Sequence, residues 1–372
     1  MQVLGKPCCS QEPNCYEARL SLGLTDGVTR SFAHRSLSVR DGRLLLNGKV
    51  VFVHGVLYQG YWPESLLTPP DMEAMQRDLQ LIKAVGFNTI RVHAVVMGEA
   101  FYAMCDKIGL LVFQDMPAGD MRAMPVWSDD RAMAEEELNV SLPQTLFNEI
   151  RRSPASQAAF ETELQAMVNS LSHFASIAVW VLFNEGWGQS NTKALVELLR
   201  NLDPHRLIDA SSGWNELGGH ALGDLADIHN YEDNSSIFGP LAMSFESFAY
   251  WGYSLAGRIP ALGEYGGVGY AVDGHCWSSR TWGYGEKRVK QSRDVYASAL
   301  EKLLLRLVES ICTGLGAAIY TQWNDVETEV NGLLTYDRHL KLPMEFYQRF
   351  SHLVQEAARK CTLVPDGKQH IG

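Results

Sequence analysis

Short apolar runs alternate with longer segments of helical periodicity along most of the chain. The runs are rich in Val, Ile, Leu and aromatic residues, which is typical of strands buried on both faces of a sheet. We predict strands at residues 51–57, 89–95, 110–116, 177–184, 207–211, 227–231, 261–264 and 317–323.

Three of the intervening segments have a clear helical pattern. Residues 71–85 repeat apolar side chains every three or four positions, and Gly86 follows as a stop signal. These side chains are Met72, Met75, Leu79 and Ile82. Residues 160–174 and 295–312 behave likewise. Strands that alternate with helices form a parallel sheet, so the pattern predicts an α/β fold, a (β/α)8 TIM barrel with insertions in its last two units.

Two segments fall outside the barrel pattern. Residues 16–39 read as one or two strands with polar alternation, and Asp41-Gly42 after them predicts a tight turn. Residues 117–153 form a long connection. We therefore divide the chain into an N-terminal segment at 1–40, the barrel at 41–362 and a tail at 363–372.

Composition and charge narrow the range of partners. The 372 residues include 32 Lys and Arg against 43 Asp and Glu, a net charge of −11 without a basic block. Nucleic acid and anionic membranes are therefore poor partners, and an uncharged ligand fits better. No apolar run approaches the ~20 residues that span a bilayer, and the start of the chain has no signal-peptide core. We expect a cytoplasmic protein by default.

Cysteine and histidine spacing predicts neither a structural nor a catalytic metal site. The seven cysteines are scattered without a CxxC pair, so we expect free thiols. His54, His93 and His229 lie near strand ends, but the chain has no HxH or HExxH pair. We predict no cofactor.

Two glutamates stand where predicted strands end. Glu185 follows the strand at 177–184, and Glu264 closes the strand at 261–264. The carboxyl ends of barrel strands meet at one mouth, where barrel enzymes carry their active sites. Two carboxylates there suit glycosidic bond cleavage, one as nucleophile and the other as proton donor. The alternative is that each glutamate only caps a loop or pairs with an arginine.

Around these glutamates the sequence resembles glycoside hydrolase family 2. The resemblance rests on Trp180 with Asn184-Glu185, on Gly263-Glu264-Tyr265, and on the stretches 41–56, 78–91 and 105–112. It covers about residues 16–345 and implies a barrel enzyme in which Glu185 is the general acid/base and Glu264 is the nucleophile. It also implies that residues 16–39 are a short remnant of an immunoglobulin-like β-domain.

The resemblance further implies a set of sugar-binding residues. Asn184 would bind the sugar 2-hydroxyl, and Arg91 would hold the nucleophile ionised. Tyr231, in the run His229-Asn230-Tyr231, would donate to the nucleophile, and His229 is expected to bind the substrate as well. Trp323 would form an apolar floor under the sugar, with core packing as the alternative. His54 and Asp115 also end strands and are expected to contact hydroxyl groups.

The sequence departs from the family in ways that bear on the substrate. The upstream sugar-binding domain is absent, which leaves an inactive carbohydrate-binding barrel or an incomplete fragment as the alternative to an enzyme. Glucuronidases of the family use an Asn-Lys pair, whereas this chain has Glu329, which would repel a uronic carboxylate. We expect a retaining exo-β-glycosidase acting on a neutral sugar, first a β-galactoside. The sequence leaves open whether the protein forms a homo-oligomer.

Overall fold

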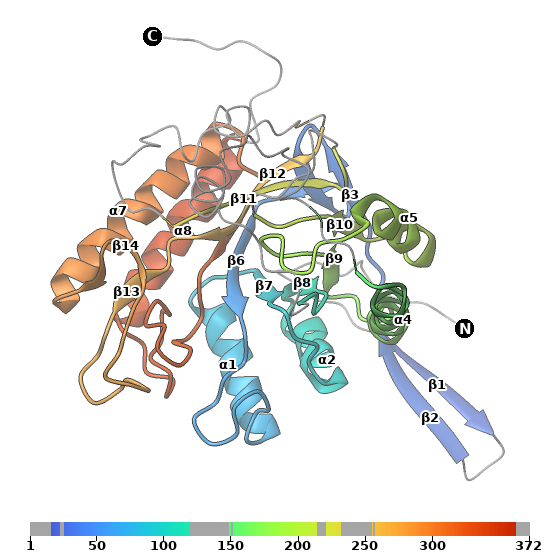
Figure 1. The fold of residues 1–372 in the computed structure, drawn as a ribbon, viewed down its shortest axis with the longest axis horizontal. Coiled ribbons are helices and arrows are strands. Elements are labelled where there is room, and N and C mark those ends of the chain that lie inside the picture. Colours follow the sequence, from blue (N-terminus) through green and yellow to red (C-terminus); the bar gives the residue numbers. More distant parts are fainter. Residues whose placement is uncertain are drawn as a thin grey trace.

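The computed structural model describes residues 16–22, 26–119, 149, 152–213, 221–231, 255 and 257–361. At its centre lies an eight-stranded sheet whose ladders are all parallel (Figure 1). Its order is β10 (Leu207–Asp209), β9 (Ile177–Val181), β8 (Leu111–Asp115), β7 (Thr89–Val92), β6 (Val53–Tyr58), β15 (Ala317–Tyr320), β12 (Ile259–Tyr265) and β11 (Leu225–Asn230). Each predicted barrel strand is confirmed.

The two edge strands of this sheet, β10 and β11, lie close enough to complete the circle. The backbone N–H of Asp224 donates to the carbonyl of Ile208 at 2.7 Å, and the N–H of Ile208 donates to the Asp224 carboxylate at 2.8 Å. The sheet is therefore a nearly closed barrel, as the alternation of strands and helices predicts.

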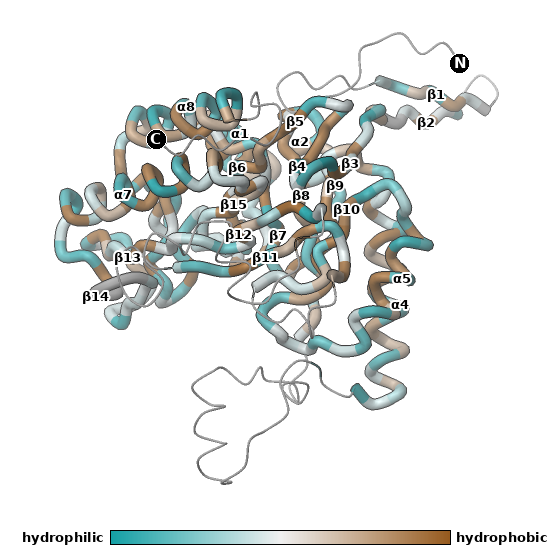
Figure 2. The backbone as a smooth tube through the Cα atoms, turned by 90° about the horizontal axis from the view of Figure 1, so that it is seen from above, coloured by the Kyte–Doolittle hydropathy of each residue, from teal (hydrophilic) through white to brown (hydrophobic). Residues whose placement is uncertain are grey.

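The helices form the outer layer. They are α1 (Met72–Ala84), α2 (Glu99–Ile108), α4 (Pro154–Leu171), α5 (Thr192–Leu202), α7 (Arg293–Cys312) and α8 (Met344–Cys361). Most carry both hydrophilic and hydrophobic residues along their length (Figure 2). In α1 the Asp71 side chain caps the N-terminus, and Met75, Leu79 and Ile82 are buried as predicted, but Met72 is 51% exposed. None of the helices in the described ranges is both long and apolar enough for a bilayer span.

A small sheet covers the end of the barrel at which the strands begin. It contains β3 (Leu37–Arg40), β4 (Arg43–Leu46) and β5 (Lys49–Val51), joined by tight turns at Asp41-Gly42 and Asn47-Gly48 whose residues all have positive φ. Such turns match the twist of a two-stranded hairpin. Leu44 and Leu46 of β4 join the apolar cluster inside the barrel with the first residues of several strands. Because apolar side chains fill this end of the barrel, a ligand site is expected at the other end, where the strands finish.

A hairpin and an inserted pair of strands complete the fold. The hairpin of β1 (Tyr16–Leu22) and β2 (Asp26–Phe32) stands away from the barrel in both views (Figures 1 and 2). β13 (Val268–Tyr270) and β14 (Tyr284–Lys290) pair in the insertion after β12. Residues 1–15, most of the predicted connection at 117–153 and the predicted tail at 363–372 lie outside the described residues.

One cysteine prediction is wrong. A disulfide joins Cys312 and Cys361, the last residues of α7 and α8, across a Cα–Cα distance of 5.0 Å. The helices pack against each other, so the chain fold brings together two cysteines 49 positions apart. Cys105 and Cys276 are free, as predicted. Disulfides are rare in a reducing cytosol, so this pairing does not favour the cytoplasmic default.

Candidate active site

The segment after β9 turns sharply at Glu185. The chain remains buried through Phe183, and the N–H of Trp187 then donates to the carbonyl of Asn184 at 2.9 Å. Glu185 and Gly186 within this turn have φ values of 51° and 78°. A positive φ is uncommon for glutamate and clusters at functional sites. The turn leaves the Glu185 side chain 16% exposed.

Glu264 lies deeper, near the end of β12. Its side chain is 5% exposed. The preceding residue, Gly263, donates its N–H to the Asp227 carboxylate at 2.5 Å, and a Cβ added there would lie 2.0 Å from that carboxylate. Only glycine permits this approach, which fixes the strand beside β11 and directs the next side chain into the mouth.

The hydroxyl group of Tyr231 contacts both glutamates. Its oxygen lies 2.8 Å from Glu264 Oε2 and 3.0 Å from Glu185 Oε1. Burial and the charges of both glutamates raise the pKa of Tyr231, so the hydroxyl stays a donor. The Tyr231 ring stacks on Tyr284 of β14, with centroids 3.8 Å apart. The two carboxylates therefore lie next to each other, as the strand-end argument predicts.

Arg91 of β7 holds the deeper part of the site together. Its guanidinium makes two contacts with Asp115, at 3.0 and 2.9 Å, and donates to Asn184 Oδ1 at 2.7 Å. It also donates to the carbonyl of Gly263 at 3.1 Å and lies 3.5 Å from Glu264 Oε1. Burial alone would lower the pKa of Arg91, but the charges of Asp115 and Glu264 raise it. The group stays cationic and places a buried positive charge beside Glu264.

Asp115 lies in the site, and both of its oxygens already have partners in the protein. Both oxygens contact Arg91, and Oδ2 also lies 2.8 Å from His93 Nδ1. Burial would raise the pKa of Asp115, but Arg91 and His93 hold it below its ordinary value. Asp115 therefore supports Arg91 and His93, and its contact with a sugar hydroxyl stays a prediction. His93 was not among the predicted sugar-binding residues.

His229 of β11 contacts Glu185 and is part of a buried polar chain. Its Nδ1 lies 2.8 Å from Glu185 Oε1, and its Nε2 lies 2.8 Å from Ser212 Oγ. Burial would raise the pKa of Glu185, but the hydrogen bond and charge of His229, followed by the hydrogen bond of Tyr231, lower it. In the free site Glu185 is therefore held in its ionised form.

Two buried aspartates that sequence analysis missed lie behind His229. Ser212 donates to Asp227 Oδ2 at 2.8 Å. Burial, together with the charge of Asp209 and a hydrogen bond from it, raises the pKa of Asp227 well above its ordinary value. Two buried carboxyl groups that lie against each other disfavour double ionisation, so such a pair retains a proton. Both residues lie on barrel strands, a signal that could have identified them.

Two predicted sugar contacts lie elsewhere. Trp323 has no exposed surface, and its indole N–H donates to Asp78 at 2.6 Å, so the packing alternative describes it. His54 points out of the barrel into a small apolar pocket, where its ring lies 4.7 Å from that of Phe87. Burial lowers the pKa of His54 to about 4. It contacts no other predicted site residue in the described part of the chain.

Glu185, His229 and Glu264 could also ligate a cation, because one ligand atom of each lies within 4.8 Å of the others. However, Arg91 already provides a buried positive charge beside Glu264. Tyr231 donates into the space between the carboxylates. This donor set suits a catalytic pair better than a metal centre.

Comparison with known proteins identifies a family for the barrel domain. Residues 37–235, more than half of the chain, match the TIM barrel domain of the glycosyl hydrolases family 2. A β-galactosidase of Klebsiella pneumoniae (strain 342) is 28% identical over 210 residues, which cover 55% of this chain and 18% of that protein. A β-galactosidase of Pectobacterium atrosepticum is 26% identical over 208 residues, which cover 54% and 18%. The chain thus spans about a fifth of these relatives.

Solved structures share the fold at low sequence identity. A β-galacturonidase from Eisenbergiella tayi bound to galacturonate superposes with a TM-score of 0.69 at 19% identity, covering 93% of this chain and 59% of that one. A Ruminococcus gnavus β-glucuronidase in complex with uronic isofagomine gives 0.71 at 16% identity, covering 94% and 59%. Taken with the match over residues 37–235, the eight-stranded barrel identifies this chain as a member of glycosyl hydrolase family 2.

Proposed function

We propose that this chain is a retaining exo-β-glycosidase that releases a terminal neutral sugar, with a β-galactoside as the first candidate. The observation that carries the proposal is the shared hydroxyl of Tyr231, which contacts Glu185 and Glu264 at once. Oxygens of the two carboxylates lie within 4.8 Å of each other. Retaining enzymes separate their carboxyl groups by ~5–5.5 Å, whereas inverting enzymes need ~6.5–9.5 Å to admit a water molecule.

Glu264 is the proposed nucleophile. Its carboxylate attacks the anomeric carbon and forms a glycosyl ester while the bond to the leaving oxygen breaks. Arg91 supports this role because its buried positive charge lies 3.5 Å from Glu264 Oε1. A nucleophile also needs shielding from water, which suits a side chain that is 5% exposed.

Glu185 is the proposed acid and base. It gives its proton to the leaving oxygen, then takes a proton from the water that cleaves the ester and restores Glu264. Its side chain is 16% exposed, which suits a group that must meet both aglycone and water. A sugar that displaces Tyr231 or His229 from Glu185 removes contacts that lower its pKa. Glu185 then takes up the proton in the complex.

Glu329 supports a neutral sugar over a uronic acid. Its carboxylate accepts hydrogen bonds from Gln322 and Asn331, both at 3.2 Å. Burial and then the charge of Glu264 raise the pKa of Glu329 to about 7. A second carboxylate within electrostatic reach of the nucleophile repels a uronate substrate. The relatives named β-galactosidases agree with this preference, whereas the structural neighbours that act on uronic acids share only the fold.

A covalent trap tests the proposal. An activated 2-deoxy-2-fluoro-β-galactoside slows the second step, and mass spectrometry should then find an adduct on Glu264. Glu185→Gln should lose activity on poor leaving groups and keep more of it on dinitrophenyl sugars. If galactose binds to the protein but no fluoro-sugar of a neutral panel labels it, the inactive sugar-binding barrel replaces the enzyme.

A further inference from the structure

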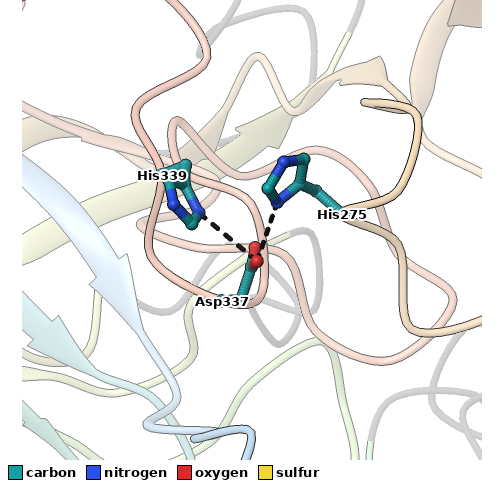
Figure 3. A group of neighbouring side chains, drawn as sticks. All are labelled: His275, Asp337 and His339. Atoms are coloured by element: carbon teal, nitrogen blue, oxygen red, sulfur yellow. Dashed lines mark hydrogen bonds and ion pairs between the residues drawn. The ribbon is translucent and has the colours of Figure 1, made fainter.

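Two histidines and an aspartate from outside the candidate active site converge on one another (Figure 3). His275 lies in the insertion between β13 and β14, and Asp337 and His339 lie in the loop after β15. Asp337 Oδ2 lies 2.7 Å from His275 Nδ1 and 3.3 Å from His339 Nδ1. One ligand atom of each residue lies within 4.8 Å of the others, so the three already share one small volume.

We propose that His275, Asp337 and His339 bind a divalent transition-metal ion, with zinc the best match. Two imidazole nitrogens and one carboxylate oxygen are ligands that zinc prefers, and three protein ligands leave a fourth position for water. Tetrahedral bonds of ~2.0–2.1 Å hold ligand atoms about 3.3–3.4 Å apart. The observed 3.3 Å between Asp337 Oδ2 and His339 Nδ1 already fits, and the 2.7 Å between Asp337 Oδ2 and His275 Nδ1 lengthens with an outward movement of the His275 ring.

The carboxylate of Asp337 is already oriented for a ligand role. The Thr335 hydroxyl donates to its Oδ1 at 2.5 Å, which leaves Oδ2 to face both rings. Metal-binding carboxylates are usually held by a hydrogen bond of this kind. The exposed fractions of the ligand side chains, 36% for His275, 28% for Asp337 and 64% for His339, leave an entry path for an ion.

The turn that carries two of the ligands is firmly anchored. Thr335 donates its N–H to the carbonyl of His339 at 2.9 Å, and the N–H of His339 donates to Thr335 Oγ1 at 3.0 Å. Arg338 donates to the carbonyls of Tyr61 and Gly60 at 2.8 and 3.1 Å. A rigid turn reduces the entropy cost of bringing ligands together on an ion.

A bound ion would join two segments that border the active site. The insertion that carries His275 continues into β14, where Tyr284 stacks on Tyr231. The segment after β15 carries Glu329, and the N–H of Trp282 donates to the carbonyl of Thr328 between the two segments at 2.9 Å. The ion would therefore hold the insertion between β13 and β14 against the segment after β15. It takes no part in the proposed reaction.

Zinc titration of the full chain, freed of metal with a chelator, tests the site. Calorimetry with zinc chloride should give one ion per chain for the wild type. His339→Ala removes an exposed ligand without disturbing the core, and its zinc affinity should fall at least about tenfold, the usual effect of disturbing a metal shell. Zinc should also raise the melting temperature of the wild type more than that of the variant.

Two further variants make the result decisive. His352→Ala removes an exposed histidine of α8 and should bind zinc like the wild type. Asp337→Asn keeps the shape but not the charge of the carboxylate and should weaken binding as His339→Ala does. Absence of zinc binding by the wild type, or equal affinity in the wild type, His339→Ala and Asp337→Asn, would overturn the proposal. Because the readout is metal binding, failure of the glycosidase proposal would leave this result unaffected.

Discussion

The guanidinium of Arg91 is paired edge to edge with the carboxylate of Asp115, Nε to Oδ1 at 3.0 Å and Nη2 to Oδ2 at 2.9 Å. The two residues are 1% and 2% exposed. Removal of the Asp115 charge takes away the nearer of the two carboxylates beside the buried guanidinium, and breaking a buried pair in this way costs about 3–5 kcal/mol. Asp115→Asn should therefore lower the free energy of unfolding in urea by this amount. Glu309→Gln, an exposed site on α7, should change it by less than about 0.5 kcal/mol.

Tyr231→Phe should distinguish the contribution of the hydroxyl group from that of the aromatic ring. The variant keeps the stack on Tyr284 and loses the contacts at 2.8 and 3.0 Å with Glu264 and Glu185. Loss of one positioned donor costs roughly 10²–10³ in kcat. We expect such a fall in kcat on an aryl galactoside with little change in melting temperature. Tyr16→Phe, in the distant hairpin, is the matched control, and equal kcat in the two variants would contradict the bridging role.

His229→Gln should move the pH dependence of activity in a defined direction. Burial would raise the pKa of Glu185, and His229 is the first of the groups that lower it. Without His229 this pKa rises, so the protonated acid persists to higher pH. The basic limb of kcat/KM should shift upward on alkyl galactosides, whose leaving groups need the proton. A dinitrophenyl galactoside needs little protonation and should show a much smaller shift. A downward shift on alkyl substrates would exclude Glu185 as the acid.

The strand-end pattern was enough to predict that two glutamates far apart in the sequence lie close together. Glu185 and Glu264 follow from apolar runs that stop at a carboxylate, and the family resemblance added Arg91, Asn184 and Tyr231, which the structure brings together. The cause is geometric, because parallel strands in a barrel end at one mouth. What each of these side chains does in catalysis stays a prediction.

Side-chain direction was harder to predict than strand position. Val53 and Leu57 of β6 face the barrel interior, so His54, one position after Val53, must face the helices. A shift of one residue reverses such an assignment, and sequence alone does not fix the first residue of a strand. Trp323 lies three residues beyond the end of β15, where alternation no longer applies.

Long-range pairings left no local signal at all. Cys312 and Cys361 meet because α7 packs on α8, and His275 meets Asp337 across two separate insertions. Spacing rules detect ligands or cysteines on one element, such as a CxxC pair, but not on two elements whose packing is unknown.

Cys312→Ser should destabilise the protein through loss of the link between α7 and α8. The bond closes a separation of 49 residues, and disulfides of this kind contribute about 2–4 kcal/mol. We expect a fall of that size in the free energy of unfolding, measured in urea without reductant. Cys276→Ser alters a free, half-buried thiol and is the control. Dithiothreitol should lower the wild-type value to that of Cys312→Ser, and no effect of the reductant would contradict the pairing.

Glu329→Gln should alter both stability and substrate choice. Burial and the charge of Glu264 raise the pKa of Glu329 from its ordinary 4.5 to about 7. A carboxyl group with a raised folded pKa contributes stability that is complete below pH 4.5 and is lost as the pH rises through 7. The wild type should therefore lose roughly 2–3 kcal/mol relative to the variant between pH 5 and 8, which urea unfolding at each pH can measure.

The same substitution tests the proposed preference for a neutral sugar. Glutamine can still accept from Gln322 or Asn331, whereas the charge that repels a second carboxylate is gone. At pH 8, where Glu329 is ionised, the ratio of kcat/KM for a β-galacturonide over a β-galactoside should rise at least about tenfold in the variant, a change of 1.4 kcal/mol. At pH 5 the wild-type residue is already neutral, so the two proteins should give the same ratio. If the wild type and the variant gave the same ratio at pH 8 as well as at pH 5, Glu329 would not face the sugar.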